Sequence, residues 1–314
     1  MKTALFFLLT VLLLSCQDPE IEEIELQISR SAIPEGIAVH PLTEEIYISS
    51  IHEDHITRSS SDGSTFEKIH GLKDNGYSIG VGLDIWKNHL YALGKYKRSS
   101  SAILTIKDLK ANESSTFTHV DLDTTYFNDL AITKQGNAFL TDTDNHRIYF
   151  FDLAKGKIST FLEDEEIKYP NGITISADQS KLFIDSYSSG IRIFDLGKKS
   201  IINHPHDPTT QLGIDGLKYN QGVLYMIVNG GKNREKHGLY ALSLVQNETD
   251  FGSLAPILVN HDKMDIPTTF SIVDDHAYVL ANSQLTNLDQ QLNKIIDTQK
   301  LDKTYVLKVA LRAQ

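Results

Sequence analysis

Residues 171–184 contain the pattern that predicts the fold. Asn171-Gly-Ile-Thr-Ile175 is a short apolar segment, a polar turn follows, and Leu182-Phe-Ile184 is a second apolar segment. The same pattern, in which the second segment is rich in Tyr and Phe, recurs five more times. The other copies begin at Glu35, Val81, Asn128, Asp215 and Thr268. From Glu35 onward the starts are separated by 46, 47, 43, 44 and 53 residues. A regular period of this length indicates a repeat architecture.

Each copy continues into further strand-like segments. A third segment is clearest at Arg147-Ile-Tyr-Phe-Phe-Asp152 and Ile191-Arg-Ile-Phe-Asp195, and a fourth at Phe117-Thr-His-Val120 and Ile257-Leu-Val259. Four short strands per repeat of this length are typical of a β-propeller blade. We therefore predict an all-β fold, a six-bladed β-propeller.

A solenoid is the structural alternative, and four glycines favour the propeller. They stand near the start of the first strand of their repeats, where blades crowd around a central axis and a side chain would not fit. These residues are Gly36, Gly82, Gly172 and Gly216.

The ring must also close. The sixth copy has a third strand, Tyr305-Val-Leu-Lys-Val309, and the chain then nearly ends, so its fourth strand is missing locally. Residues 24–28, Ile-Glu-Leu-Gln-Ile, alternate between apolar and polar with the period of a strand. We expect this segment to supply the missing strand, so that residues 24–314 form a single propeller.

The N-terminus has the pattern of an export signal. Lys2 precedes an eleven-residue apolar run, Ala4 to Leu14, which is too short to span a bilayer comfortably. The run ends at Leu13-Leu14-Ser15-Cys16, which resembles a bacterial lipobox. We predict a lipoprotein signal peptide over residues 1–15 and lipidation of Cys16, the alternative being an ordinary secretory signal with a chance cysteine.

The next segment, residues 16–23, is predicted to be an acidic tether. It resembles the acidic stretches that send some lipoproteins to the cell surface, although a solvated linker has the same composition. The expected location is the bacterial cell envelope, with the protein lipid-anchored at the outer membrane and either periplasmic or surface-exposed. The lipid is then the only contact with the membrane.

The amino-acid composition excludes some classes of binding partner and of metal site. Thirty Lys and Arg against 41 Asp and Glu give a net charge of −11, which argues against a nucleic-acid partner. The single cysteine excludes a disulfide framework or a cysteine-based zinc site within the chain. A small-molecule ligand is the expected partner, and the sequence does not specify an oligomeric state.

The first position of each repeat should point into one end of the central channel. Four of the six positions carry carboxylate or amide oxygens, which are costly to bury unsatisfied. One divalent cation would satisfy them: Ca²⁺ is expected, with Mg²⁺, Mn²⁺ and Zn²⁺ as alternatives, since all-oxygen ligation suits hard ions better than zinc. The other interpretation is that these residues only cap turns. The four residues are Glu35, Asn128, Asn171 and Asp215.

The motifs around these positions resemble the senescence-marker-protein/gluconolactonase/luciferin-regenerating-enzyme family of six-bladed propellers, and the related paraoxonase-type lactonases. The resemblance spans about residues 24–311 and depends on four motifs: Ile33-Pro-Glu35-Gly, Phe127-Asn128-Asp129, Pro170-Asn171-Gly172-Ile-Thr-Ile-Ser-Ala-Asp178 and Ile214-Asp215-Gly216. It implies a divalent metal, usually calcium, on Glu35, Asn171 and Asp215. Asn128 would ligate the metal or contact substrate and water.

Two departures from the family pattern concern the substrate. Tyr126 stands where sugar-lactone members commonly carry Arg, and Leu130 stands where they commonly carry Gly. These changes argue against a sugar-acid lactone but leave the expected metal ligands unchanged. Residues 137–152 also resemble an NHL repeat, a type of blade that often serves binding without chemistry.

The leading hypothesis is metal-dependent hydrolysis of a lactone or related ester. Asp215 is expected to act as general base or only as a ligand, and Asn128 to position substrate and water. Substrate contacts are expected from loops on the same face, at Tyr126, His52, Asp142, Asp185 and Tyr187, with Lys95 to Arg98, Lys232 and Arg234 as further candidates. The alternative is a non-catalytic, NHL-like envelope propeller that binds a ligand or protein partner, and an isomerase or synthase on this fold is a third possibility.

Overall fold

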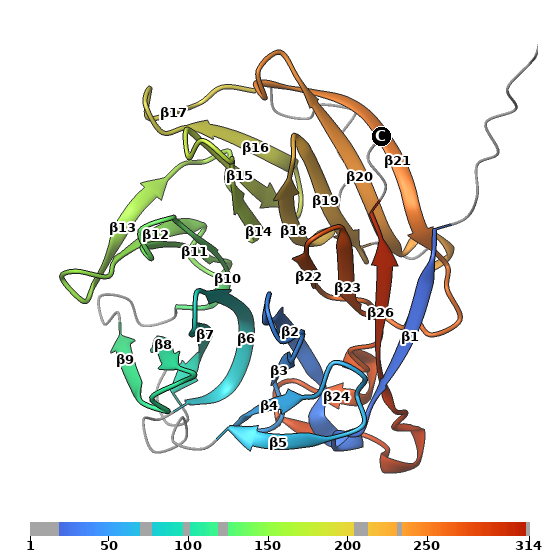
Figure 1. Cartoon of the computed structure of the whole chain (residues 1–314). Coiled ribbons are helices and arrows are strands. Elements are labelled where there is room, and N and C mark those ends of the chain that lie inside the picture. Colours follow the sequence, from blue (N-terminus) through green and yellow to red (C-terminus); the bar gives the residue numbers. More distant parts are fainter. Residues whose placement is uncertain are drawn as a thin grey trace, which may run out of the picture.

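The structure is a computed structural model that describes residues 19–69, 77–96, 101–118, 125–203, 213–230 and 234–311. Six four-stranded antiparallel sheets stand around a central axis (Figure 1). The prediction of an all-β, six-bladed propeller is confirmed. The predicted signal peptide and Cys16 lie outside the described residues.

The blades follow the order of the repeats. Blade one holds β2 (Pro34–Val39), β3 (Ile46–Ser50), β4 (Ile56–Ser59) and β5 (Phe66–Ile69). Blade two holds β6 (Tyr77–Trp86), β7 (His89–Tyr96), β8 (Ala102–Asp108) and β9 (Ser114–Thr118). Blade three holds β10 (Phe127–Ile132), β11 (Ala138–Asp142), β12 (Arg147–Asp152) and β13 (Lys157–Glu163).

The remaining blades complete the ring. Blade four holds β14 (Pro170–Ile175), β15 (Lys181–Ser186), β16 (Gly190–Asp195) and β17 (Ser200–Ile201). Blade five holds β18 (Ile214–Asn220), β19 (Val223–Val228), β20 (Gly238–Val245) and β21 (Asp250–Val259). Blade six holds β22 (Phe270–Val273), β23 (His276–Leu280), β26 (Thr304–Ala310) and β1 (Ile21–Leu26). Short 3₁₀ turns are η1 (Arg30–Ala32), η3 (Arg234–Lys236), η4 (Leu285–Asn287) and η5 (Thr298–Lys300).

The first strand of every blade lies innermost. Each inner strand contacts the inner strand of the next blade, and β22 contacts β2 (Figure 1). Side chains alternate between the two faces of a strand, so each blade packs one set against each neighbour. One such cluster joins Leu104 of blade two to Phe127 and Tyr149 of blade three. The core is therefore a ring of apolar layers between blades.

The N-terminal strand occupies the outer position of blade six. β1 pairs antiparallel with β26, from Ile21 opposite Val309 to Leu26 opposite Thr304. The strand lies earlier than the expected 24–28, and residues 21–23, assigned to the tether, belong to it. The reason is packing, because Ile21 contacts the core between blades five and six, which extends the pairing toward the N-terminus.

The chain between β23 and β26 contains an insertion, residues 284–303, that the repeat pattern does not predict. It forms the small hairpin of β24 (Leu288–Asp289) and β25 (Lys294–Ile295), with η4 and η5 on either side. Leu288 and Leu301 are buried against Ile33 of blade one, so the insertion packs over that blade (Figure 1). Among the described residues, no helix has the length and apolar character needed to cross a membrane.

Candidate functional site

A β-bulge directs the first position of the repeats toward the axis. In blades one to five the register of the first two strands shifts at this point, for example between Pro34 and Ile37 and between Pro170 and Ile173. A bulge leaves residues outside the ladder and re-aims their side chains. The following glycine packs against the next blade, and a Cβ on Gly36 would clash with the carbonyl oxygen of Val81. The expected steric need for glycine is confirmed there.

The four polar first-position side chains line one small cavity on the axis. Glu35, Asn128, Asn171 and Asp215 come from four blades and meet there. Asn171 donates from Nδ2 to Oδ1 of Asp215 at 2.9 Å, and Asn128 donates from Nδ2 to Oγ1 of Thr143 at 3.0 Å. No described residue donates to Oδ1 of either asparagine. Both amide oxygens therefore remain available as acceptors or ligands.

Asn229 is a member of this cluster that the sequence did not reveal. It follows β19 and donates from Nδ2 to Oδ2 of Asp215 at 2.5 Å and to the carbonyl oxygen of Pro267 at 2.9 Å. Thr143 holds the equivalent place after β11, and its Oγ1 donates to the carbonyl oxygen of Pro170 at 2.7 Å. A polar residue directly after the second strand of a repeat is the sequence signal that could have identified both residues.

The cavity brings together carboxylates whose charged forms are disfavoured. Oε2 of Glu35 is buried and has no hydrogen-bond partner among the residues that the structure describes. Burial, with the Asp215 carboxylate as a second cause, raises the pKa of Glu35 well above its usual value. Burial also raises the pKa of Asp215 to about 7, against the opposing hydrogen bonds from Asn229 and Asn171. Asp129 lines the same cavity and also raises the pKa of Asp215, so three carboxylates gather there beside the amide oxygens, a donor set that fits a hard divalent cation.

Two predicted substrate-contact residues lie close to this centre. Tyr126 and Glu35 line an adjoining cavity, and the Nζ atom of Lys95 lies 4.5 Å from the centroid of the Tyr126 ring. Burial, then Glu35 and Asp215, raise the pKa of Tyr126. Burial and the same Asp215 carboxylate raise the pKa of Tyr187, whose side chain is partly exposed. Both phenols therefore stay neutral near the carboxylates.

Asp142 and Asp185, two further predicted substrate contacts, are both fully buried in their blades. Oδ1 of Asp142 accepts from the backbone N–H of Tyr126 at 3.1 Å, and Oδ2 accepts from Asn145 at 2.8 Å. Asp142 therefore supports a turn. Neither oxygen of Asp185 has a hydrogen-bond partner within the described part of the chain, and burial raises its pKa well above the usual value. Neither carboxylate is exposed to a substrate.

The remaining candidates lie away from the axial cavity. His52 lines a neighbouring surface pocket with Glu53 and His55, and its Nδ1 is 3.2 Å from Oδ1 of Asn293. Asn293 also lines the cavity next to Glu35, and the predicted substrate contact of His52 stays a prediction. Arg234 pairs with Asp265 at 2.6 Å on blade six. Lys232 and the segment 97–98 lie outside the described residues.

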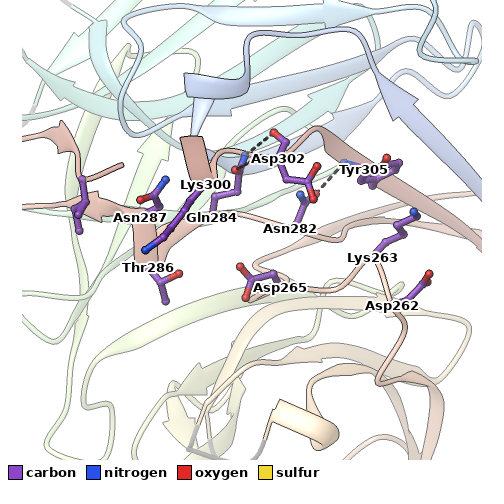
Figure 2. Close-up of a pocket in the computed structure, with 11 residues that line it drawn as sticks. Asp262, Lys263, Asp265, Asn282, Gln284, Thr286, Asn287, Lys300, Asp302 and Tyr305 are labelled. Carbon is purple, nitrogen blue, oxygen red and sulfur yellow. Dashed lines mark hydrogen bonds between the residues drawn. The ribbon is translucent and has the colours of Figure 1, made fainter. Parts of the chain in front are cut away.

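A separate polar pocket of about 510 Å³ lies beside the insertion and β26 (Figure 2). Two amide side chains of the pocket accept hydrogen bonds from backbone N–H groups. Gln284 Oε1 accepts from Asp302 N–H at 2.7 Å, and Asn282 Oδ1 accepts from Tyr305 N–H at 2.8 Å. The first bond joins the two ends of the insertion, and the second joins the residues that flank it, so both bonds close the base of the insertion beside the pocket.

A lysine and two aspartates form a second group of charged side chains in the channel. Lys218 Nζ lies 3.4 Å from Asp129, and Asp84 contributes a second nearby carboxylate. Burial disfavours the Lys218 charge, but Asp129 and Asp84 outweigh it and raise the pKa of Lys218. Lys218 and Asp84 line a pocket with Tyr219 and several aliphatic side chains. Lys218 can balance one of these two carboxylates, and its partner Asp129 also lines the Glu35–Asp215 cavity.

Within the described ranges, one surface cluster of acidic and histidine side chains also has metal-ligand spacing. Glu23, His261 and Asp262 offer atoms within 4.8 Å of one another. Lys263 Nζ lies 3.9 Å from Glu23, so an ammonium already contacts this group. The axial cluster is the better candidate, since its Glu35 oxygen is buried and unpaired.

The fold and the ring of carboxylates and amides define a gluconolactonase-like β-propeller. The sequence profile described as the SMP-30/Gluconolactonase/LRE-like region matches residues 33–232, and the chain belongs to this family. The family resemblance expected from the motifs is therefore confirmed. A search of curated protein sequences finds no significant match.

Solved structures share the fold at low sequence identity. A luciferin-regenerating enzyme is 14% identical with a TM-score of 0.60, covering 93% of this chain and 95% of that chain. The gluconolactonase XC5397 from Xanthomonas campestris is 12% identical with a TM-score of 0.61, covering 94% and 96%. Virginiamycin B lyase from Staphylococcus aureus is 14% identical with a TM-score of 0.57, covering 94% and 100%.

Proposed function

We propose that the protein is a divalent-metal-dependent hydrolase of a lactone or related ester, with its centre at the axial cavity. One observation carries the proposal: four oxygen-bearing side chains from four blades line one cavity in which Glu35 Oε2 is buried without a partner. Glu35, Asn171 and Asp215 would hold the cation, and Asn128 would ligate it or contact substrate. Ca²⁺ is the expected ion because all donors are oxygens.

When bound, the cation would act as a Lewis acid on the substrate carbonyl and balance the charge that develops on its oxygen. Asp215 would accept a proton from water as the water oxygen bonds to the carbonyl carbon. The ester C–O bond then breaks, and the proton passes from Asp215 to the leaving alkoxide. Asn171 and Asn229 hold both oxygens of Asp215, so the carboxylate orientation is fixed before substrate arrives.

A hydrolysis screen tests this function. The protein, loaded with Ca²⁺ or treated with chelator, would be assayed against lactones and aryl esters by proton release. We expect activity that chelator removes and Ca²⁺ restores, and loss of at least about a hundredfold in Glu35→Gln and Asp215→Asn.

The matched control is Asp178→Asn, because Asp178 is an exposed turn carboxylate that bonds Ser176 and Ser180. This variant should keep full activity. Calcium binding without hydrolysis of any substrate would instead favour the non-catalytic binding propeller.

We also propose that the protein is anchored in the cell envelope by lipid on Cys16. The support is the lipobox-like sequence and the position of the cysteine, the single one in the chain, at its end. The folded ring begins at β1, so the anchor would connect to the outer edge of blade six through a few residues.

A further inference from the structure

We propose that the substrate carries an apolar group beyond its lactone or ester function, and that this group binds in the cavity next to Glu35. The inference depends on the proposed function and specifies its substrate class. The cavity has a volume of about 270 Å³ and shares Glu35 with the axial centre. Four aliphatic side chains form its apolar wall: Ile51, Ile79, Leu285 and Leu288.

The apolar wall is preorganised. Leu288 is buried with Ile33 and Leu301, and Ile51, Leu285 and Ile295 pack against this group. Gln284 adds a polar attachment, because its Nε2 donates to the carbonyl oxygen of Arg30 at 3.4 Å. Since the insertion is packed onto blade one, its leucines form a fixed surface on which an apolar ligand group loses water without reorganising the protein.

The rest of the cavity lining is polar: Glu35, Lys95, Tyr126, Gln290 and Asn293. Lys95 lies against the Tyr126 ring, and Oδ1 of Asn293 is within hydrogen-bond distance of His52. A sugar lactone needs a partner for each hydroxyl that it buries, and hydroxyls left unpaired against aliphatic side chains weaken binding. The wall of Ile51, Ile79, Leu285 and Leu288 offers no such partner. The aliphatic wall therefore suits an alkyl chain better than a polyol.

Lys95 gives the same cavity a cationic group. Ring opening releases a carboxylate, and an ammonium at the edge of an aliphatic pocket attracts that group. This arrangement fits a substrate with its carbonyl toward Glu35 and its alkyl group toward the insertion.

A chain-length series tests the inference. The Ca²⁺-loaded full-length protein would be assayed with γ-butyrolactone, γ-hexalactone, γ-octalactone, γ-decalactone and glucono-δ-lactone. Each methylene that enters the cavity should raise kcat/KM roughly fourfold until the cavity is full. Glucono-δ-lactone should be the poorest substrate.

Two matched variants separate specificity from stability. Leu285 and Ile295 are both partly buried against the same cluster, but of the two only Leu285 lines the cavity. Leu285→Ser should flatten the chain-length dependence, whereas Ile295→Ser should keep the wild-type slope. Equal slopes in the two variants, or preference for glucono-δ-lactone in the wild type, would overturn the inference while leaving the hydrolase function intact.

Failure of the proposed function gives a different result. If no lactone is hydrolysed, calorimetric titration with the hydroxydecanoate product and with gluconate tests the cavity by itself. Tighter binding of hydroxydecanoate, weakened in Leu285→Ser, would support the apolar pocket. Equal binding of the two acids would overturn it.

Discussion

Asn229 holds Asp215 from the side opposite Asn171, donating to Oδ2 at 2.5 Å while Asn171 donates to Oδ1 at 2.9 Å. The same Asn229 nitrogen also bonds the carbonyl oxygen of Pro267 in the next blade. One amide therefore fixes both the orientation of the carboxylate and the spacing of two blades. Support of this kind around a ligating carboxylate is what sets affinity and reactivity in metal centres.

Replacement of Asn229 tests that role. Asn229→Ala should lower calcium affinity or kcat/KM by roughly 10- to 100-fold, because Asp215 loses one of its two amide donors. Asn229→Thr is the control, since Thr143 makes the equivalent inter-blade bond with a hydroxyl in blade three. It should recover most of the Tm lost in Asn229→Ala. Wild-type calcium affinity and kinetics in Asn229→Ala would contradict the assignment.

The buried carboxylates make the stability of the metal-free protein depend on pH. Their pKa values are raised in the folded state, so that state binds more protons than the unfolded chain, and the free energy of unfolding falls as pH rises. The loss should begin near pH 4, the usual carboxyl range, and continue through about pH 7 for Asp215. Thermal unfolding in chelator measures it.

Calcium should reverse this loss, raising Tm more at about pH 8 than at about pH 5, because binding requires the ionised carboxylates. Glu35→Gln and Asp215→Asn should each flatten the pH dependence relative to wild type. A Tm difference between wild type and both variants that does not change with pH would refute the account.

Asp185 is predicted to be a destabilising residue. In the equivalent register, Ser49 Oγ donates to the Val81 carbonyl at 2.5 Å, and Thr141 Oγ1 donates to the Asn171 carbonyl at 2.8 Å. Asp185 has no partner for either oxygen, and an unsatisfied buried polar group costs about 1–3 kcal/mol. Asp185→Thr should therefore raise the free energy of unfolding by about 1–3 kcal/mol.

The reciprocal change, Thr141→Asp, should destabilise by at least as much, since it removes a satisfied hydroxyl and buries a charge. Chemical unfolding of both variants measures the pair. Destabilisation by Asp185→Thr would show that the carboxylate makes a contact essential to the blade.

The N-terminal strand should be essential to the closed ring. In a Cys16→Ala background, deletion of residues 17–26 removes buried Ile24 and Leu26 and leaves β26 as an open edge. We expect a large drop in Tm and aggregation on heating. Deletion of residues 17–20 ends before β1 and should leave Tm unchanged, so equal Tm values for the two deletions would exclude this closure.

Lipidation is tested separately by fractionation. The wild-type protein should fractionate with membranes and label with a fatty-acid probe, and Cys16→Ala should lose both properties. Retention of Cys16→Ala in the membrane fraction would end the lipoprotein proposal.

The repeats made much of the site predictable. Glu35, Asn128, Asn171 and Asp215 stand at one repeated position, and a ring of equivalent blades brings one repeated position to one place. Asn229 was missed because its position after the second strand holds chemically different residues in other blades, such as Thr143 and Tyr187. The burial of Asp142 and Asp185 was not predicted, because a polar residue at a strand end gives no sign of whether it is buried.

By itself, the sequence determined the blade number, the order of strands and the axial ring of oxygen donors, because these follow from a short period and from local alternation of apolar and polar residues. Only the tertiary structure decided which carboxylates are hydrogen-bonded and which are left alone, and that the insertion with Leu285 and Leu288 lies over blade one. The physical reason is that desolvation, partner geometry and packing between segments far apart in the chain depend on three-dimensional position, which no local pattern encodes.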